Sequence, residues 1–118
     1  MTELDGRLAT AIVQRYRDRF GRGPTEAKAI IREDFALVIL GSAQTEVERS
    51  LVADGERESV EFLRRRVRQI AAPEFCAVTE EIVGKKVTAM LGDHNADANT
   101  TVLVFLLDRP DLVGTAGE

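Results

Sequence analysis

The stretch FGRGPTEAK, residues 20–28, separates a helical pattern from an extended one. Upstream of it, apolar residues recur at every fourth position: Leu4, Leu8, Ile12, Tyr16 and Phe20. This spacing predicts one amphipathic helix over residues 4–20. Gly21 stands where a left-handed C-terminal cap is expected, and Pro24 follows within the usual distance of a helix end. The stretch therefore predicts the end of a helix and the start of a strand.

The same stretch has a second interpretation, because glycines beside an arginine can form a phosphate-binding loop. Such a loop follows a strand and precedes a helix, so that backbone amides converge on the anion. Here the helix comes first and the strand second. We therefore interpret Gly21, Gly23 and Pro24 as structural, and we expect Arg22 to be an exposed contact for a carboxylate or phosphate of a partner.

Downstream of this stretch, the sequence predicts a β-hairpin and then two helices. A strand near residues 29–32 meets a turn at 33–34, and FALVIL at 35–40 forms the second strand. Residues 45–53 have helical spacing, and a longer helical pattern covers residues 60–82. Pro73 falls inside the longer pattern, so we expect a kink or a restarted helix there. Gly84 is expected to end it.

The last part of the chain predicts two more strands. Val87, Ala89 and Leu91 alternate as one face of a strand, the loop GDHNADANT follows, and TVLVFLL at 101–107 forms the last strand. The tail at 109–118 is expected to be frayed. The order α-β-β-α-α-β-β predicts an α+β fold, in which helices pack on one face of a four-stranded, mostly antiparallel sheet made of two hairpins.

Length and composition indicate one cytoplasmic domain over residues 1–118, with an ordered core at about 4–108. Cys76 is the single cysteine, which suits a reducing compartment, and the N-terminal MTELDGRLAT does not resemble a signal peptide. The longest apolar run is far too short to span a bilayer, so no membrane insertion is expected. A net charge of −4 argues against a nucleic-acid partner.

The arginine-rich run at residues 64–68 is the most pronounced charge feature of the chain. Arg64, Arg65 and Arg68 are expected on the polar face of the long helix, where Glu61 lies four residues before Arg65 and can pair with it. A solvated helix face is the favoured interpretation. The other is a binding surface for an anionic partner, with an acidic protein placed first because the chain itself is acidic.

The loop DHNADAN is the candidate ligand or metal site. Asp93, Asn95, Asp97 and Asn99 alternate like the first ligands of a calcium-binding loop, but Ala98 and Val104 occupy the positions that require Gly and Glu. We favour a simple turn, since Asn and Asp tolerate turn conformations. The hypothesis that Asp93, His94 and Asp97 form a weak ligand or divalent-metal site stays open.

No set of residues in the sequence forms a recognisable catalytic motif. His94 is the only histidine and has no Ser or Cys beside it, and nothing near Cys76 would lower the pKa of its thiol. The prediction is a non-enzymatic protein without a cofactor that acts through protein contacts. Two alternatives remain: a domain that senses a small ligand or ion through residues 93–99, and an enzyme of unrecognised type.

The chain resembles the MpsC-like family. The resemblance covers residues 4–108 and is carried by GRGP after the first helix, the helix end EEIVG and the closing strand VFLLD. It implies a small soluble accessory component associated with a membrane ion or inorganic-carbon transport system. It implies no reaction, and it places a histidine-then-acid pair, here His94 and Asp97, before the last strand.

The two longest strands predict a homodimer. FALVIL and VLVFLL are apolar at consecutive positions instead of alternating, so both faces of the sheet require apolar cover. One helical layer covers one face, which would leave Val38, Leu40 and their neighbours exposed in a large apolar patch. A second copy of the chain is the favoured cover. The alternative is a long helix divided at Pro73, with its halves on opposite faces.

Overall fold

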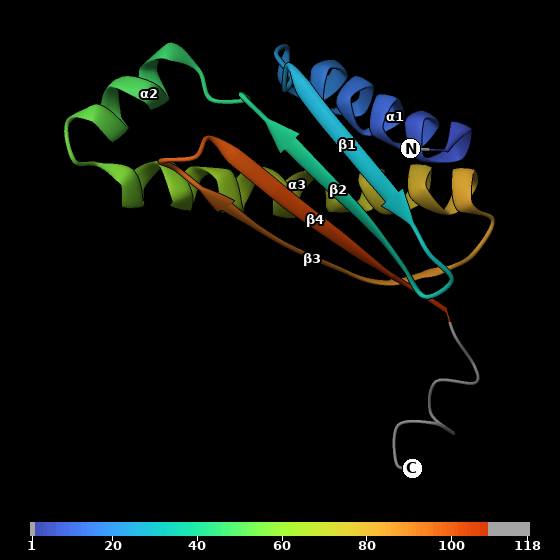
Figure 1. Ribbon diagram of the computed structural model, residues 1–118. Coiled ribbons are helices and arrows are strands. Elements are labelled where there is room, and N and C mark those ends of the chain that lie inside the picture. Colours follow the sequence, from blue (N-terminus) through green and yellow to red (C-terminus); the bar gives the residue numbers. More distant parts are fainter. Residues whose placement is uncertain (1, 109–118) are drawn as a thin grey trace.

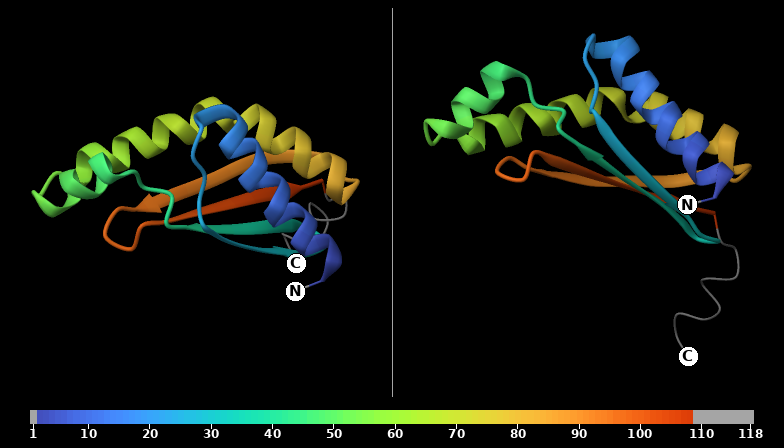
Figure 2. Two further views of the ribbon diagram at one scale, coloured as in Figure 1. Left: turned by 90° about the horizontal axis from the view of Figure 1, so that it is seen from above. Right: turned by 45° about the horizontal axis from the view of Figure 1, so that its top comes forward.

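The computed structural model describes residues 2–108 and confirms the α+β architecture. In chain order, the elements are α1 (Glu3–Phe20), β1 (Glu26–Ile31), β2 (Phe35–Gly41), α2 (Glu46–Ala53), α3 (Arg57–Val83), β3 (Val87–Asn95) and β4 (Thr100–Leu107). The sheet has the strand order β1-β2-β4-β3, and every neighbouring pair is antiparallel. The helices lie on one face of the sheet, and α2 with the first part of α3 extends beyond it (Figures 1 and 2). The predicted tail at 109–118 lies outside the described residues.

Helix α1 is capped at both ends by residues close in the chain. Thr2 and Asp5 form a reciprocal capping box at its start, and Asp5 also accepts a hydrogen bond from the backbone N–H of Ile31 at 3.0 Å. Gly21 ends the helix with φ 79°, and its N–H donates to the carbonyl of Arg17. The predicted cap is therefore confirmed, and the bond to Ile31 fixes α1 against the edge of the sheet.

The core lies between the helical layer and the sheet. It contains Leu8, Ile12, Ala29, Ala36, Val38, Leu40, Phe75, Val78, Leu103 and Phe105. Tyr16 stacks on Phe75 with a ring-centroid distance of 6.2 Å. Because α1 and α3 bury their apolar faces against one side of the sheet, and α2 packs on α3 beyond it, the other side receives no cover from residues 2–108.

Helix α3 runs without a break through Pro73, so the predicted restart of the helix is wrong. Ala71 and Phe75, which flank the proline, are fully buried in the core. Their burial holds both sides of the proline against the same face of the sheet, even though the ring removes one helical hydrogen bond. The division of the helix between two faces is therefore excluded. Gly84 ends α3 with φ 78°, as predicted.

The last hairpin differs from the prediction in two ways. Strand β3 continues to Asn95, so the predicted loop at 92–100 shrinks to a turn at 96–99. The register also shifts between Val87 and Ala89, which places Val87 in the core while Ala89 shares the opposite face with Leu91. A β-bulge of this kind reverses the side-chain alternation that a sequence pattern assumes.

Candidate functional site: an open apolar face and a buried polar cluster

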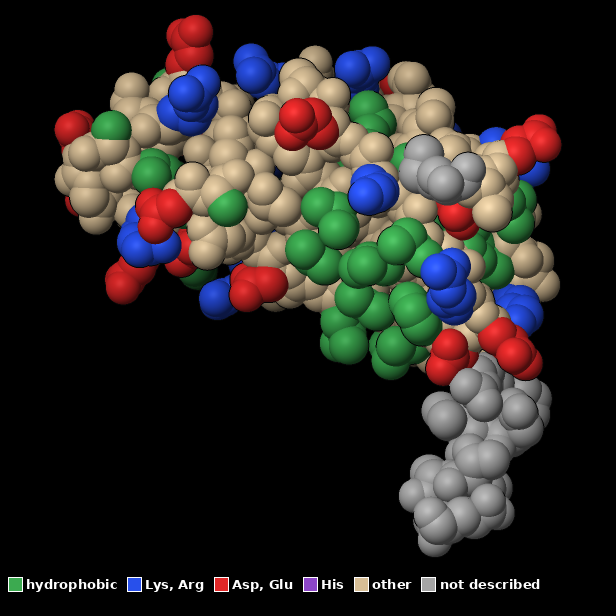
Figure 3. Space-filling model, in the orientation of Figure 1, with side chains coloured by type: hydrophobic (Ala, Val, Ile, Leu, Met, Phe, Trp, Pro, Cys, Tyr) green, Lys and Arg blue, Asp and Glu red, His purple; other side chains and the backbone are tan. Residues whose placement is uncertain are grey.

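The face of the sheet that points away from the helices is apolar. In β2, the core residues Ala36, Val38 and Leu40 face the helices, so the residues between them face outward. The strand register adds residues of the other strands to the same surface. This open face comprises Ile30, Phe35, Leu37, Ile39, Ala89, Leu91, Val102, Val104 and Leu106. Figure 3 shows hydrophobic side chains gathered over the strands on this side.

The open face is accessible to water over much of its area. Leu91 is 55% exposed and Leu106 is 37% exposed, and the remaining side chains are half-buried among one another. The expected apolar patch is therefore present, but the two residues named for it were wrong. Val38 and Leu40 are buried under the helices, and Leu37 and Ile39 are on the open face instead. Contiguous apolar surfaces of this kind are typical of interaction sites.

A buried polar cluster holds α2 and α3 against α1. The Arg64 guanidinium donates to both carboxylate oxygens of Glu48, each at 2.7 Å, and to the carbonyl of Ala43 at 2.6 Å. It also donates to the Tyr16 hydroxyl, and Arg64 and Glu48 are each 5% exposed. Burial raises the pKa of Glu48, but hydrogen bonds from Arg64 and Thr45 outweigh it, so the net pKa falls below the usual value. The lowered pKa keeps the Glu48 carboxylate ionised beside the Arg64 guanidinium.

Arg64 was therefore predicted wrongly as part of an exposed partner surface. Its position on α3 turns the side chain toward Glu48 and Tyr16, where a fork of donors matches a carboxylate and a carbonyl. Arg22 and Arg65 are exposed, and their role as partner contacts stays a prediction. Arg68 is half-buried, its Nη1 atom has no hydrogen-bond partner, and burial lowers its pKa.

His94 belongs to a second buried network, next to the first. Gln44 Nε2 lies 2.9 Å from both the Ala96 carbonyl and His94 Nε2, so the two amide hydrogens are donated to these acceptors. The proton of the imidazole is then on Nδ1, which donates to Thr101 Oγ1 at 2.7 Å. Burial lowers the pKa of His94 to about 4, and the nearby positive charge of Arg64 adds to the effect. The ring is neutral and fully hydrogen-bonded at neutral pH.

The predicted ligand site at Asp93, His94 and Asp97 is not assembled. Neighbouring residues of a strand point to opposite faces, so His94 is buried toward the helices while Asp93 lies on the open side. Asp97 forms an ion pair with Arg57 of α3. Within the described chain, no group of three or more His, Cys, Asp or Glu side chains is placed to hold a metal ion. The extension of β3 through residue 95, which the sequence did not indicate, separates these side chains.

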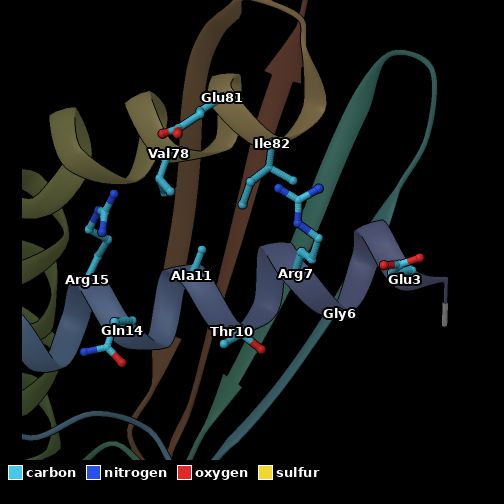
Figure 4. A pocket seen from close by; sticks show the side chains of 10 residues that line it. All are labelled: Glu3, Gly6, Arg7, Thr10, Ala11, Gln14, Arg15, Val78, Glu81 and Ile82. Carbon is cyan, nitrogen blue, oxygen red and sulfur yellow. The ribbon is translucent and has the colours of Figure 1, made fainter.

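The helical layer carries an open groove of its own, between α1 and the end of α3. Its volume is about 690 Å³, and Ala11, Val78 and Ile82 form an apolar floor between charged walls. Arg7 and Arg15 point into it from α1, and Glu81 does so from α3 (Figure 4). The groove is on the opposite side of the molecule from the open face of the sheet. Cys76, nearby on α3, is half-buried, and burial raises the pKa of its thiol.

Two residues of these buried networks, Glu48 and Gln44, were not predicted from the sequence. Glu48 had a visible signal, because Thr45 followed three residues later by Glu48 is the pattern of a capping box, and the structure contains that box. Gln44 had no signal, since a lone glutamine before a helix is ordinary. Its partner His94 is 50 residues away, and only the tertiary fold places the segment between β2 and α2 beside the last hairpin.

Within residues 2–108, the structure contains no helix long and apolar enough to cross a membrane. The chain is an α+β domain in which one apolar face of the sheet is left uncovered by residues 2–108. A profile of the family described as Na⁺-translocating membrane potential-generating system (MpsC) matches residues 2–109, and the chain belongs to this family. No curated protein and no solved structure is significantly similar to it.

Proposed function

We propose that this protein is a non-enzymatic, homodimeric accessory or regulatory component of a Na⁺-translocating membrane system, and that it acts through protein contacts. The open apolar face of the sheet carries this proposal. A second copy of the chain provides an apolar surface of the same extent, and two-fold dimers are the commonest oligomers. Membership in the MpsC family supplies the connection to a membrane-potential-generating system.

The non-enzymatic part of the proposal rests on how the reactive side chains are used. Both ring nitrogens of His94 are engaged by Gln44 and Thr101. Arg64 and Glu48 neutralise each other in the interior. The raised pKa of Cys76 disfavours its thiolate at neutral pH. The engagement of these groups in the fold supports a non-enzymatic role.

Self-association is tested by light scattering after size exclusion. At micromolar concentration we expect twice the 13.0 kDa chain mass. Leu91→Asp, at the β3 end of an apolar row on the open face, should give a folded monomer. Ile70→Asp is the matched control, because Ile70 is 45% exposed on the outer surface of α3 and Leu91 is 55% exposed on the sheet. A wild-type protein that elutes as a monomer would refute the dimer.

Association with the transport system is tested separately. The tagged dimer is incubated with detergent-solubilised membranes from its own cell, and co-purifying proteins are identified by mass spectrometry. We expect membrane subunits of an ion-translocating system to be retained by the wild type. Recovery of none of them, from membranes in which such a system is detected, would remove the transport part of the proposal while leaving the dimer intact.

A further inference from the structure

The open face carries an ordered pattern of charge as well as an apolar surface. Across the sheet, Lys28 pairs with Ile39, Ile39 pairs with Val102, and Val102 pairs with Asp93. These residues form one straight row over all four strands, with a cation at the β1 edge and an anion at the β3 edge. Lys28 and Asp93 are both exposed, and neither forms a salt bridge among residues 2–108. Asp93 accepts a hydrogen bond from the N–H of His94, and its charge also acts on Arg68.

The neighbouring rows place this charged row at a boundary. The row toward the turn between β1 and β2 is wholly apolar and consists of Ile30, Leu37, Val104 and Leu91. The row on the other side has no large apolar side chain and consists of Glu26, Gly41, Thr100 and Asn95. The charges of Lys28 and Asp93 therefore flank the edge of the apolar area, as charges do at the rim of a protein interface.

We propose that two copies pack face to face through this surface, about a two-fold axis that runs along the strands between β2 and β4. This inference rests on the self-association proposed above and specifies its geometry. Rotation about such an axis places β1 over β3 of the partner and lays each row over the same row. Lys28 then faces Asp93 of the partner subunit at both ends of the row, and Ile39 faces Val102 of the partner subunit.

Other two-fold arrangements do not both cover the apolar rows and pair opposite charges. An axis across the strands places β1 over β1 of the partner, so that each sheet edge meets its own charge, which is repulsive. Pairing of β1 edges would leave the apolar face in water. That edge is also partly occupied, because the Ile31 N–H donates to Asp5 at 3.0 Å. The axis along the strands covers the apolar rows and pairs opposite charges at the same time.

The spacing of packed sheets fits these contacts. Sheets stack about 10 Å apart, with strand directions within about 30° of each other. A lysine side chain reaches across a gap of that size, so a Lys28 ammonium at the rim meets a carboxylate that projects from the opposing sheet. Two such ion pairs per dimer contribute modestly to affinity and chiefly fix the register of the partners.

The test is a charge swap measured by sedimentation equilibrium. Lys28→Glu and Asp93→Lys each create two repulsive contacts per dimer, and each should raise the dimer dissociation constant roughly tenfold. The double variant Lys28→Glu/Asp93→Lys restores two attractive contacts and should recover nearly wild-type affinity. Arg49→Glu is the control for net charge, because Arg49 is exposed on α2, which extends beyond the sheet, and it should dimerise like the wild type.

The possible results separate the geometry from the proposed function. Recovery in the double variant supports the axis along the strands. Single variants that dimerise as tightly as the wild type, or a double variant as weak as the singles, would overturn this axis while the dimer itself stands. A monomeric wild type would overturn both. Circular dichroism on each variant establishes that a loss of dimer is not a loss of fold.

Discussion

The burial of a neutral histidine makes stability depend on pH in a defined direction. His94 is 3% exposed, accepts a hydrogen bond from Gln44 and has a pKa of about 4 in the folded protein, against 6.5 for an ordinary histidine. The unfolded chain therefore binds a proton more readily between these two pH values. The stability that depends on the neutral ring is complete above about pH 6.5 and is lost as the pH falls toward about 4.

The size of the effect follows from the two pKa values. The full separation corresponds to about 3 kcal/mol, at about 1.4 kcal/mol per pH unit. Between about pH 7 and about pH 5, linkage gives a loss of about 2 kcal/mol. Arg64 and Arg68 disfavour the protonated ring, while Glu48 and Glu61 favour it, so the burial of the ring is the dominant cause.

Urea unfolding at about pH 7.5 and about pH 5 measures this loss, at one protein concentration because a dimer couples stability to concentration. His94→Gln is the comparison, since glutamine can bond to both Gln44 and Thr101 but does not titrate. We expect the wild type to lose about 2 kcal/mol more than His94→Gln over this range. Equal pH dependence in the two proteins would refute the buried, neutral state of His94.

Two further predictions concern stability. Glu48→Gln leaves the Arg64 charge in the interior without its counter-ion. We expect the free energy of unfolding, measured by urea titration, to fall by about 3 kcal/mol. A loss below about 1 kcal/mol would mean that water replaces the carboxylate. Gly21→Ala forces a side chain into φ 79° where nothing lies within 4 Å, so strain alone should cost about 1 kcal/mol, and an unchanged melting temperature would contradict the role of the cap.

The sequence was sufficient for the order and type of the elements. Periodicity every fourth residue gave α1, and Gly21 and Gly84 gave the ends of α1 and α3, because caps and turns depend on residues close in the chain. The family resemblance also followed from short segments, and the profile match over residues 2–109 confirmed it. The mostly apolar strands correctly indicated a sheet with apolar residues on both faces.

Only the tertiary structure decided which face of each strand is covered and which polar groups are buried. When both faces of a strand are apolar, the sequence pattern does not show which face the helices cover. The pattern alone therefore does not show that Val38 is buried under the helices while Leu37 lies on the open face. Arg64 and His94 looked like surface residues, and their burial depends on Glu48 and Gln44, which lie 16 and 50 residues away in the chain. A charged or polar side chain is buried in a core only where partners supply its hydrogen bonds or its counter-charge. Here those partners are distant in the chain, so the local sequence does not show that they come together.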